Sequence, residues 1–271
     1  MIIDFHTHIF PHKLVAGAMA QLQSHCDVKA ASVPTLEALG EAMDKYGVDK
    51  SVVLNIVTKE KQHEHVLKFA KEVDSDKSGR FIAFASIMPG SPRALEYVWK
   101  ASDEALKGLK LHPALQRIDV DDKRLFPVYD LARALNLVVI FHGGWDTTYR
   151  DEMRASVQMT INIVKNFPGL RLVAAHMGGM HLARDVMENL AGKYELYFDT
   201  SYATDDPWLD ARIFRDIIRK HGAHRILFGS DFPWHLPSAE MELIRGLDIS
   251  DEEKDMILGQ NAARLLGLAV K

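Results

Sequence analysis

The sequence predicts an α/β protein with the (β/α)8 barrel fold, the TIM-barrel architecture. Eight short runs rich in Val, Ile, Leu and Phe alternate with longer segments of helical period over 271 residues. Strands that alternate with helices form right-handed βαβ units, and these units build a parallel sheet. Eight such units in a chain of this length favour a closed barrel. The alternative, an open doubly wound sheet, is disfavoured because no G-x-G-x-x-G motif follows the first run.

The predicted strands are, in order, 2–6, 50–57, 80–87, 108–112, 137–142, 170–176, 196–200 and 225–230. Capping and stop residues mark the helices between them. Thr35 is placed to cap a helix, and helices are predicted to end at 166–169 and at 221–222, where glycine follows. The stretch 12–32 is predicted to pass over the barrel mouth. The charged cluster 63–65 is predicted to lie on a solvated helix face.

The composition is that of an ordinary soluble globular protein, with 47% hydrophobic and 26% charged residues. The formal net charge of -4 argues against nucleic acid or an anionic membrane as a partner. Cys26 is the only cysteine, so no internal disulfide can form and a cytoplasmic location is expected. No run approaches the roughly 18 apolar residues of a membrane span. No linker divides the chain, so residues 1–271 are expected to form one domain, and homo-oligomer formation is left open.

The most informative segment is Asp4-Phe5-His6-Thr7-His8, at the end of the first predicted strand. Side chains alternate between the two faces of a strand, so His6, His8 and Asp4 are expected to point the same way. Two imidazoles one step apart can hold a divalent metal, because neutral histidine nitrogen suits Zn, Mn, Fe or Co. Buried histidines are often only structural, however, so the pair needs support from the rest of the chain.

Ionisable residues also end other predicted strands. Lys110 and His112 share one face at the end of the fourth, His142 ends the fifth, His176 ends the sixth and Asp231 follows the eighth. A closed barrel brings the carboxyl ends of its strands together. An apolar strand has no structural need for such an ending, so these side chains are predicted to form one site. The glycine pairs that follow His142 and His176 are expected to leave room for a ligand.

Five motifs, DFHTH, GLKLHP, HGG, HMGG and GSDFPW, follow one another along nearly the whole chain. Together they resemble the amidohydrolase superfamily, and within it the amidohydrolase-related family, which includes nonoxidative decarboxylases. The resemblance implies that His6, His8, His142 and Asp231 are the ligands of one divalent metal. Zinc is the expected ion, with manganese, iron or cobalt as alternatives. The resemblance also implies that Asp231 is a general base and that His176 stabilises the transition state or transfers a proton.

Lys110 is open to two interpretations. In binuclear members of the superfamily, a lysine on the fourth strand is carboxylated and bridges two ions, and the histidines of strands five and six bind the second ion. The resemblance therefore does not exclude a second ion that contacts Lys110 and His176. We favour a single ion, with Lys110 paired with a carboxylate or an anionic substrate, because buried lysines usually keep a counter-charge.

Residues in the loops after the strands are expected to contact a small-molecule substrate. The candidates are His112, Trp145, Arg150 and Trp234. A tryptophan at a barrel mouth can stack on a substrate, although it more often packs against a loop. Arg150 is placed to bind a substrate carboxylate, although exposed arginines are usually only solvated.

These expectations give three hypotheses about function. The first is a metal-dependent hydrolase, in which metal-activated water attacks a carbonyl-type carbon in a lactone, an amide or a similar small substrate. The second is a metal-dependent nonoxidative decarboxylase of a small carboxylated substrate, which would use much the same ligands. The third is a non-catalytic binding barrel, which the complete set of expected ligands argues against. The sequence does not separate the first two, because one fold can support both reactions.

Overall fold

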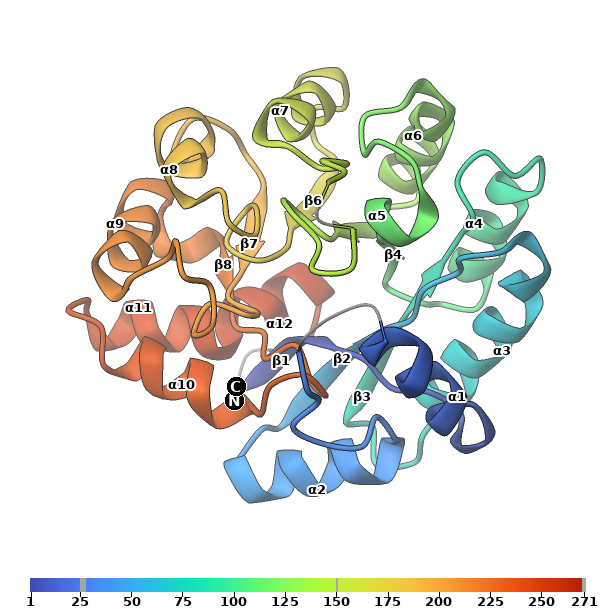
Figure 1. The fold of residues 1–271 in the computed structure, drawn as a ribbon, viewed down its shortest axis with the longest axis horizontal. Coiled ribbons are helices and arrows are strands. Elements are labelled where there is room, and N and C mark those ends of the chain that lie inside the picture. Colours follow the sequence, from blue (N-terminus) through green and yellow to red (C-terminus); the bar gives the residue numbers. More distant parts are fainter. Residues whose placement is uncertain (25–27, 150, 270–271) are drawn as a thin grey trace.

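The computed structural model describes residues 1–24, 28–149 and 151–269, and it contains eight parallel strands in one sheet, in the order β1 to β8 (Figure 1). The strands are β1 (Ile3–Thr7), β2 (Lys50–Leu54), β3 (Phe81–Ser86), β4 (Gly108–Leu111), β5 (Val138–Phe141), β6 (Arg171–Ala174), β7 (Tyr197–Asp199) and β8 (Ile226–Leu227). Each strand overlaps the segment predicted for it. The predicted (β/α)8 barrel is therefore confirmed.

Helices surround the sheet on its outer side (Figure 1). The α-helices are α1 (His12–Gln23), α2 (Leu36–Tyr46), α3 (His63–Asp74), α4 (Ala94–Asp103), α5 (Pro113–Gln116), α6 (Phe126–Ala134), α7 (Val157–Asn166), α8 (Ala183–Asp185), α9 (Ala211–His221), α10 (Pro237–Arg245), α11 (Asp251–Asp255) and α12 (Asn261–Leu266). The 3-10 helices are η1 (Glu60–Gln62), η2 (Lys123–Leu125) and η4 (Ala223–Arg225), and the π-helices are η3 (Val186–Leu190) and η5 (Met256–Gln260). Thr35 caps α2 as predicted, because its side chain accepts a hydrogen bond from the Ala38 backbone. In the described ranges, no helix is both long enough and apolar enough to cross a membrane.

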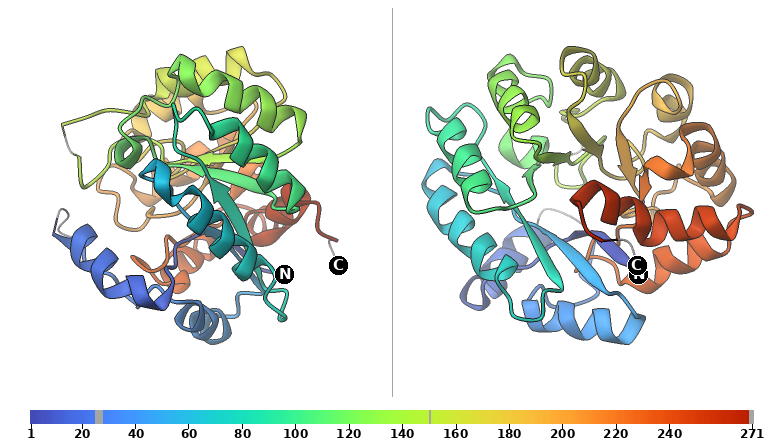
Figure 2. Two further views of the ribbon diagram at one scale, coloured as in Figure 1. Left: turned by 90° about the vertical axis from the view of Figure 1, so that its right-hand side faces the viewer. Right: turned by 180° about the vertical axis from the view of Figure 1, so that it is seen from behind.

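The barrel interior is filled by apolar side chains that recur at every second strand position, as expected for one face of each strand. Val52 and Leu54 of β2 and Ile82 and Phe84 of β3 follow this pattern. Helix α12 adds further apolar side chains to the same core, and Figure 2, seen from behind, shows this helix against the barrel. A larger core lies between the sheet and the surrounding helices. The barrel interior beneath the polar site described below is therefore filled with apolar side chains.

The barrel closes between its first and last strands through a short series of backbone hydrogen bonds. The Asp231 backbone N–H donates to the His6 carbonyl at 2.9 Å, and the His8 N–H donates to the Phe232 carbonyl at 2.6 Å. This seam joins the strand that carries the two histidines to the loop that carries the aspartate. Residues that are far apart in the sequence therefore come together at one rim.

Strand β1 departs from regular alternation. Its register against β2 shifts between Asp4 and Thr7, and an extra residue in a strand moves the side chains before it to the other face. The expectation that Asp4 points with His6 and His8 is therefore wrong. The Asp4 carboxylate instead accepts hydrogen bonds from the Ser230 backbone N–H at 2.9 Å and from its Oγ at 2.5 Å.

Helix α1 lies apart from the barrel core. None of its side chains is buried, and Figure 2 shows it at the edge of the molecule. Ala18, Gln21 and Leu22 of this helix line the cavity described below. For its described part, the segment 12–32 therefore covers the barrel mouth as predicted.

The cluster 63–65 is only partly solvated. Glu64 and His65 are exposed, but His63 is buried. The His63 ring stacks on Tyr97 of α4 with ring centroids 4.2 Å apart, and its Nε2 accepts a hydrogen bond from the Met88 backbone. The prediction of a solvated face is therefore wrong for His63, because α4 packs against this side of α3.

Candidate metal centre and active site

His6 of β1, His8 directly after this strand and Asp231 after β8 form a compact group of metal-ligating atoms. The Nε2 atoms of the two histidines lie 3.2 Å apart, and Asp231 Oδ1 lies 3.6 Å from His6 Nε2 and 3.4 Å from His8 Nε2. Ligands about 2.0–2.1 Å from a tetrahedral ion are separated by about 3.3 Å. The three atoms therefore have the spacing of ligands around one ion.

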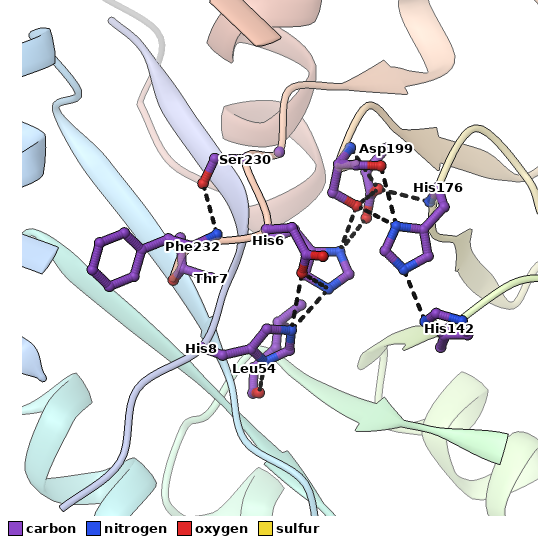
Figure 3. A network of polar contacts seen from close by, with 12 residues as sticks. His6, Thr7, His8, Leu54, His142, His176, Asp199, Ser230 and Phe232 are labelled. Carbon is purple, nitrogen blue, oxygen red and sulfur yellow. Dashed lines mark hydrogen bonds and ion pairs between the residues drawn. The ribbon is translucent and has the colours of Figure 1, made fainter. Parts of the chain in front are cut away.

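The other ring nitrogens of the two histidines are held by groups from neighbouring strands (Figure 3). Nδ1 of His6 lies 2.8 Å from Oδ2 of Asp199, and Nδ1 of His8 lies 2.7 Å from the Leu54 carbonyl oxygen. Both partners accept, so the ring protons reside on Nδ1 and the Nε2 lone pairs face the candidate ion. This arrangement fixes the tautomer and orientation of metal-binding histidines in many proteins.

The electrostatics keep these groups in the protonation states that metal ligands need. Burial, followed by the charge of Lys110, lowers the pKa of His6 to about 4. Burial also holds the pKa of His176 well below its ordinary value. Burial acts in the opposite direction on Asp231, but its contact with the His8 ring and the neighbouring imidazoles keep its pKa well below the ordinary value. At neutral pH, the His6 and His176 imidazoles are neutral and Asp231 is ionised.

Two of the predicted catalytic residues occupy unfavourable backbone conformations. His176 has a φ of 57° and Asp231 a φ of 69°, in the left-handed region that residues other than glycine rarely adopt. Strain of this kind costs of order 1–3 kcal/mol for each residue and is concentrated at functional sites. The conformation of these two residues supports a functional role for both.

His142 lies beside the three-ligand group but is not part of it. Its Nδ1 lies 2.9 Å from His176 Nε2, and its Nε2 lies 2.8 Å from the Trp145 carbonyl oxygen. Figure 3 shows the His142 and His176 rings joined in this way. The role of His142 as a fourth ligand therefore stays a prediction.

A second group of metal-ligating side chains consists of His112, His142 and Asp146. Asp146 Oδ2 lies 3.5 Å from His112 Nε2 and 3.9 Å from His142 Nε2. The two rings are stacked, with centroids 4.5 Å apart and planes at 15°. The lone pair of a ring nitrogen lies in the plane of its ring, so two nearly parallel stacked rings cannot both direct a lone pair to one point between them. This geometry suits contacts with polar groups of a substrate better than the binding of an ion.

Lys110 of β4 lies at the floor of the site. Its side chain is fully buried, and its Nζ lies 3.1 Å from His6 Nε2. Burial lowers the pKa of Lys110 to about 8, although the charges of Asp199 and Asp231 oppose this effect. The side chain therefore remains protonated at pH 7.

These side chains open into a cavity of about 290 Å³. His112 and Trp234 line this cavity, and their contact with a substrate stays a prediction. Trp145 instead lines a neighbouring depression together with Trp208. Arg150 lies outside the described residues.

The glycines after His142 and His176 do not provide space for a ligand, contrary to expectation. Gly144 has a φ of 79°, and a methyl group there would overlap the backbone of Met180. A methyl group on Gly178, which has a φ of 88°, would lie 2.9 Å from the Phe198 ring. Gly144 therefore allows the loops after β5 and β6 to pack closely against each other, and Gly178 allows the loop after β6 to pack against Phe198 of β7.

Three residues of the site were not singled out from the sequence. Asp199 is fully buried, holds His6 and accepts hydrogen bonds from the His176 backbone at 3.0 Å and the Ser201 hydroxyl at 2.5 Å. Asn55 and Asp146 line the cavity. Asp199 is the last residue of β7, so the rule that polar residues at strand ends form the site could have found it.

Comparison with known proteins supports the family suggested by the motifs. A curated relative, 2-amino-3-carboxymuconate-6-semialdehyde decarboxylase of Dictyostelium discoideum, is 22% identical, and the alignment covers 98% of this chain and 91% of the relative. An uncharacterised TIM-barrel protein from Bordetella bronchiseptica has a TM-score of 0.81 at 21% identity, with 98% of both chains covered. A dihydroxybenzoic acid decarboxylase from a Polaromonas species, solved with bound manganese, has a TM-score of 0.72 at 17% identity and covers 98% of this chain and 96% of its own.

At these identities the structural likeness shows the fold alone. The family model gives stronger evidence, because the model for amidohydrolases matches residues 3–268. The match spans all eight strands and all the predicted ligands. The resemblance inferred from the sequence motifs is confirmed, and the chain belongs to the amidohydrolase family.

Proposed function

We propose that this enzyme of the amidohydrolase superfamily is a metal-dependent nonoxidative decarboxylase of a small carboxylated substrate. The observation that carries the proposal is that the His6, His8 and Asp231 group opens into the same cavity as the buried cation Lys110. An electrophilic ion beside a fixed positive charge suits a substrate that is itself a carboxylate. The relative matched over 98% of the chain is named a decarboxylase, which supports this alternative over the hydrolase that we placed first on sequence grounds.

The side chains of the site fit a single divalent ion. His6, His8 and Asp231 would hold it, with His142 as the predicted fourth ligand. Imidazole nitrogen with one carboxylate suits Zn, Mn, Fe or Co. Zinc remains our expectation, and manganese is the alternative that the Polaromonas structure supports. When bound, the ion supplies a Lewis acid that polarises oxygen atoms of the substrate.

Asp231 and His176 are the proposed proton carriers. In the reaction, the bond between the substrate carbon and its carboxylate breaks, carbon dioxide leaves, and the electron pair of that bond takes up a proton, which these groups relay from solvent water, to form a C–H bond. No oxidant or reductant is needed. The His176–His142 contact of 2.9 Å can pass a proton between the rings, because a neutral imidazole has one donor and one acceptor nitrogen.

The cavity walls would assist by excluding water. Ile9, Leu54, Ile56, Leu115 and Met180 contribute apolar surface around the polar floor. An ionised carboxylate loses most of its hydration in such a cavity, whereas carbon dioxide is uncharged and loses little. The carboxylate therefore depends on the polar groups at the floor of the cavity, and not on water, for its partners.

The proposal is tested by incubating metal-loaded protein with small aromatic and unsaturated carboxylates in D2O. We expect release of carbon dioxide and one deuterium in the product, at the carbon that lost the carboxylate. The Asp231→Asn and His176→Gln variants should lower both signals. Lactones and amides are assayed in parallel: their cleavage without carbon dioxide release would restore the hydrolase hypothesis, and binding of both classes without turnover would support a non-catalytic barrel.

A further inference from the structure

Lys110 lies at the floor of the cavity but is not one of the proposed metal ligands, so its presence there needs another explanation. Its side chain is fully buried, and its ammonium group has one close polar neighbour, Nε2 of His6 at 3.1 Å. Within the described ranges, no carboxylate oxygen lies within 4.0 Å of Nζ to form an ion pair. Buried charges are costly unless they are paired. The ammonium group therefore lacks the counter-charge that its position requires.

Metal binding would remove even the neighbour that Lys110 has. His6 Nε2 is the atom that faces His8 Nε2 and Asp231 Oδ1, so its lone pair would bond to the ion. An ion about 2.0–2.1 Å from this nitrogen would lie no more than about 5 Å from the ammonium group. Two cations this close repel each other unless an anion lies between them.

We propose that Lys110 binds the carboxylate of the substrate, which lies between the ammonium group and the metal. A carboxylate has two acceptor oxygens, so one can face each cation. This inference rests on the proposed function in identifying the anion as the carboxylate that is later lost. Lys110 is then a substrate-binding residue that selects an anion over a neutral amide of the same shape.

A second donor group in the cavity wall, the side-chain amide nitrogen of Asn55, has no hydrogen-bond partner among the described residues. Asn55 follows β2 directly, lines the cavity and is 8% exposed, and its Nδ2 makes no hydrogen bond in the structure. A buried donor left unpaired costs about 1–3 kcal/mol. Lys110 and Asn55 are therefore both donors, and a ligand rich in acceptor oxygens would satisfy them.

The test uses Co²⁺-loaded protein, because the visible spectrum of the ion reports what binds beside it. Benzoate and its neutral analogue benzamide are titrated into wild type and into Lys110→Met, Lys110→Gln and Lys107→Met. Lys107 is an exposed residue just before the same strand and serves as the matched control. Circular dichroism checks that each variant is folded, and Lys110→Gln takes the place of Lys110→Met if the latter does not fold.

We expect both Lys110 variants to bind benzoate at least about tenfold more weakly than wild type, since a hydrogen bond to a charged group is lost. Benzamide affinity and the Lys107→Met control should not change. The Lys110 variants should also bind Co²⁺ at least as tightly as wild type, because a neighbouring positive charge is removed.

Loss of metal from the Lys110 variants would overturn the proposal and indicate a carboxylated, metal-bridging lysine. Equal benzoate affinity in wild type and variants, or no saturable benzoate binding to wild type, would overturn it as well. The binding experiment gives its result whether or not the protein turns over a substrate. A protein that binds benzoate through Lys110 but releases no carbon dioxide from any carboxylate would contradict the decarboxylase and retain this binding role.

Discussion

Asp199 determines which nitrogen of His6 faces the cavity. Its Oδ2 lies 2.8 Å from Nδ1 of His6, and the rest of its hydrogen bonds tie it to the His176 backbone and the Ser201 hydroxyl. Burial acts to raise the pKa of Asp199, but the hydrogen bonds that it accepts from the His6 ring and the Ser201 hydroxyl keep this pKa below its ordinary value, so the carboxylate is ionised. One carboxylate on β7 thus orients a ligand on β1 and supports the backbone of a residue after β6.

We predict that Asp199→Asn weakens metal binding about 10–100-fold, the usual effect of losing a partner of a metal-binding histidine. The asparagine keeps one acceptor oxygen but cannot hold the negative charge beside His6. Competition with a fluorescent chelator measures the dissociation constant. Asp206→Asn is the control, at a buried carboxylate whose hydrogen bonds, in the part of the chain that the structure describes, come only from the His181 and Trp208 backbones. Equal affinity in both variants would contradict the prediction.

His142→Ala tests the fourth ligand. If His142 turns toward the ion when it binds, the variant should bind metal at least tenfold more weakly and should lose activity while the barrel stays folded. Metal content by elemental analysis and secondary structure by circular dichroism measure the two effects. Full metal content in the variant would limit the protein ligands to His6, His8 and Asp231.

At the scale of single residues, the sequence predicted the metal ligands better than the side chains that hold them in place. His6, His8 and Asp231 could be assigned because each follows an apolar strand in a motif of the family. Asp199 ends a strand of only three residues, which the sequence did not distinguish from its flanks. Asp4 was misplaced because a register shift leaves no mark in the pattern of apolar residues.

Among the elements, the loops after β5 and β6 show the closest backbone packing at the site. Gly144 and Met180 form an isolated parallel bridge, and the Met180 N–H donates to the Gly143 carbonyl at 2.9 Å. The loop after β5 carries His142 and Asp146, and the loop after β6 follows His176. Close packing of the two loops therefore fixes the relative positions of His142 and His176.

We predict that Gly144→Ala destabilises the protein by roughly 2–5 kcal/mol, from left-handed strain and from overlap with Met180. Gly169→Ala is the matched control, because Gly169 has a similar φ of 82° and open space around the added methyl group. It should cost only about 1–2 kcal/mol. Urea denaturation measures both values, and equal losses would show that the overlap is relieved by movement of the loops.

The order of the elements was predictable because strand periodicity and helix stops are local properties of the chain. The environment of His63 was not, because it depends on α4, which is more than thirty residues away in the sequence. The glycines after β5 and β6 were misinterpreted for the same reason. Their role is set by a neighbouring loop or strand and not by the histidine beside them.

For the whole molecule, acid stability depends on histidines that are buried in the neutral form. His221 is 1% exposed, its Nε2 donates to the Leu196 carbonyl at 2.9 Å, and its Nδ1 accepts from the Gly192 backbone. Protonation of Nδ1 would break the second of these bonds. Burial, followed by the charge of Arg225, lowers its pKa to about 4 from an ordinary value of 6.5. Between these values the unfolded chain binds more protons than the folded one, so stability is lost as the pH falls.

We predict that His221→Gln makes metal-free protein less stable at pH 7 and that this difference shrinks on acidification. The wild type should lose roughly 2–3 kcal/mol more than the variant between pH 7 and pH 4.5, because glutamine takes up no proton. Urea denaturation at the two pH values in the presence of a chelator measures this. Parallel loss of stability in both proteins would assign the acid sensitivity to other groups.

The seam between β1 and β8 has a consequence for how the protein acquires its ion. His6 lies on the first strand, His8 directly follows it, and Asp231 follows the last strand. A chain still on the ribosome therefore lacks one of the three metal ligands until Asp231 has been synthesised. Metallation should therefore follow ring closure during biosynthesis. Once bound, the ion would link β1 to the loop after β8. Removal of the ion by a chelator should therefore increase the rate of unfolding if unfolding begins with separation of these two segments.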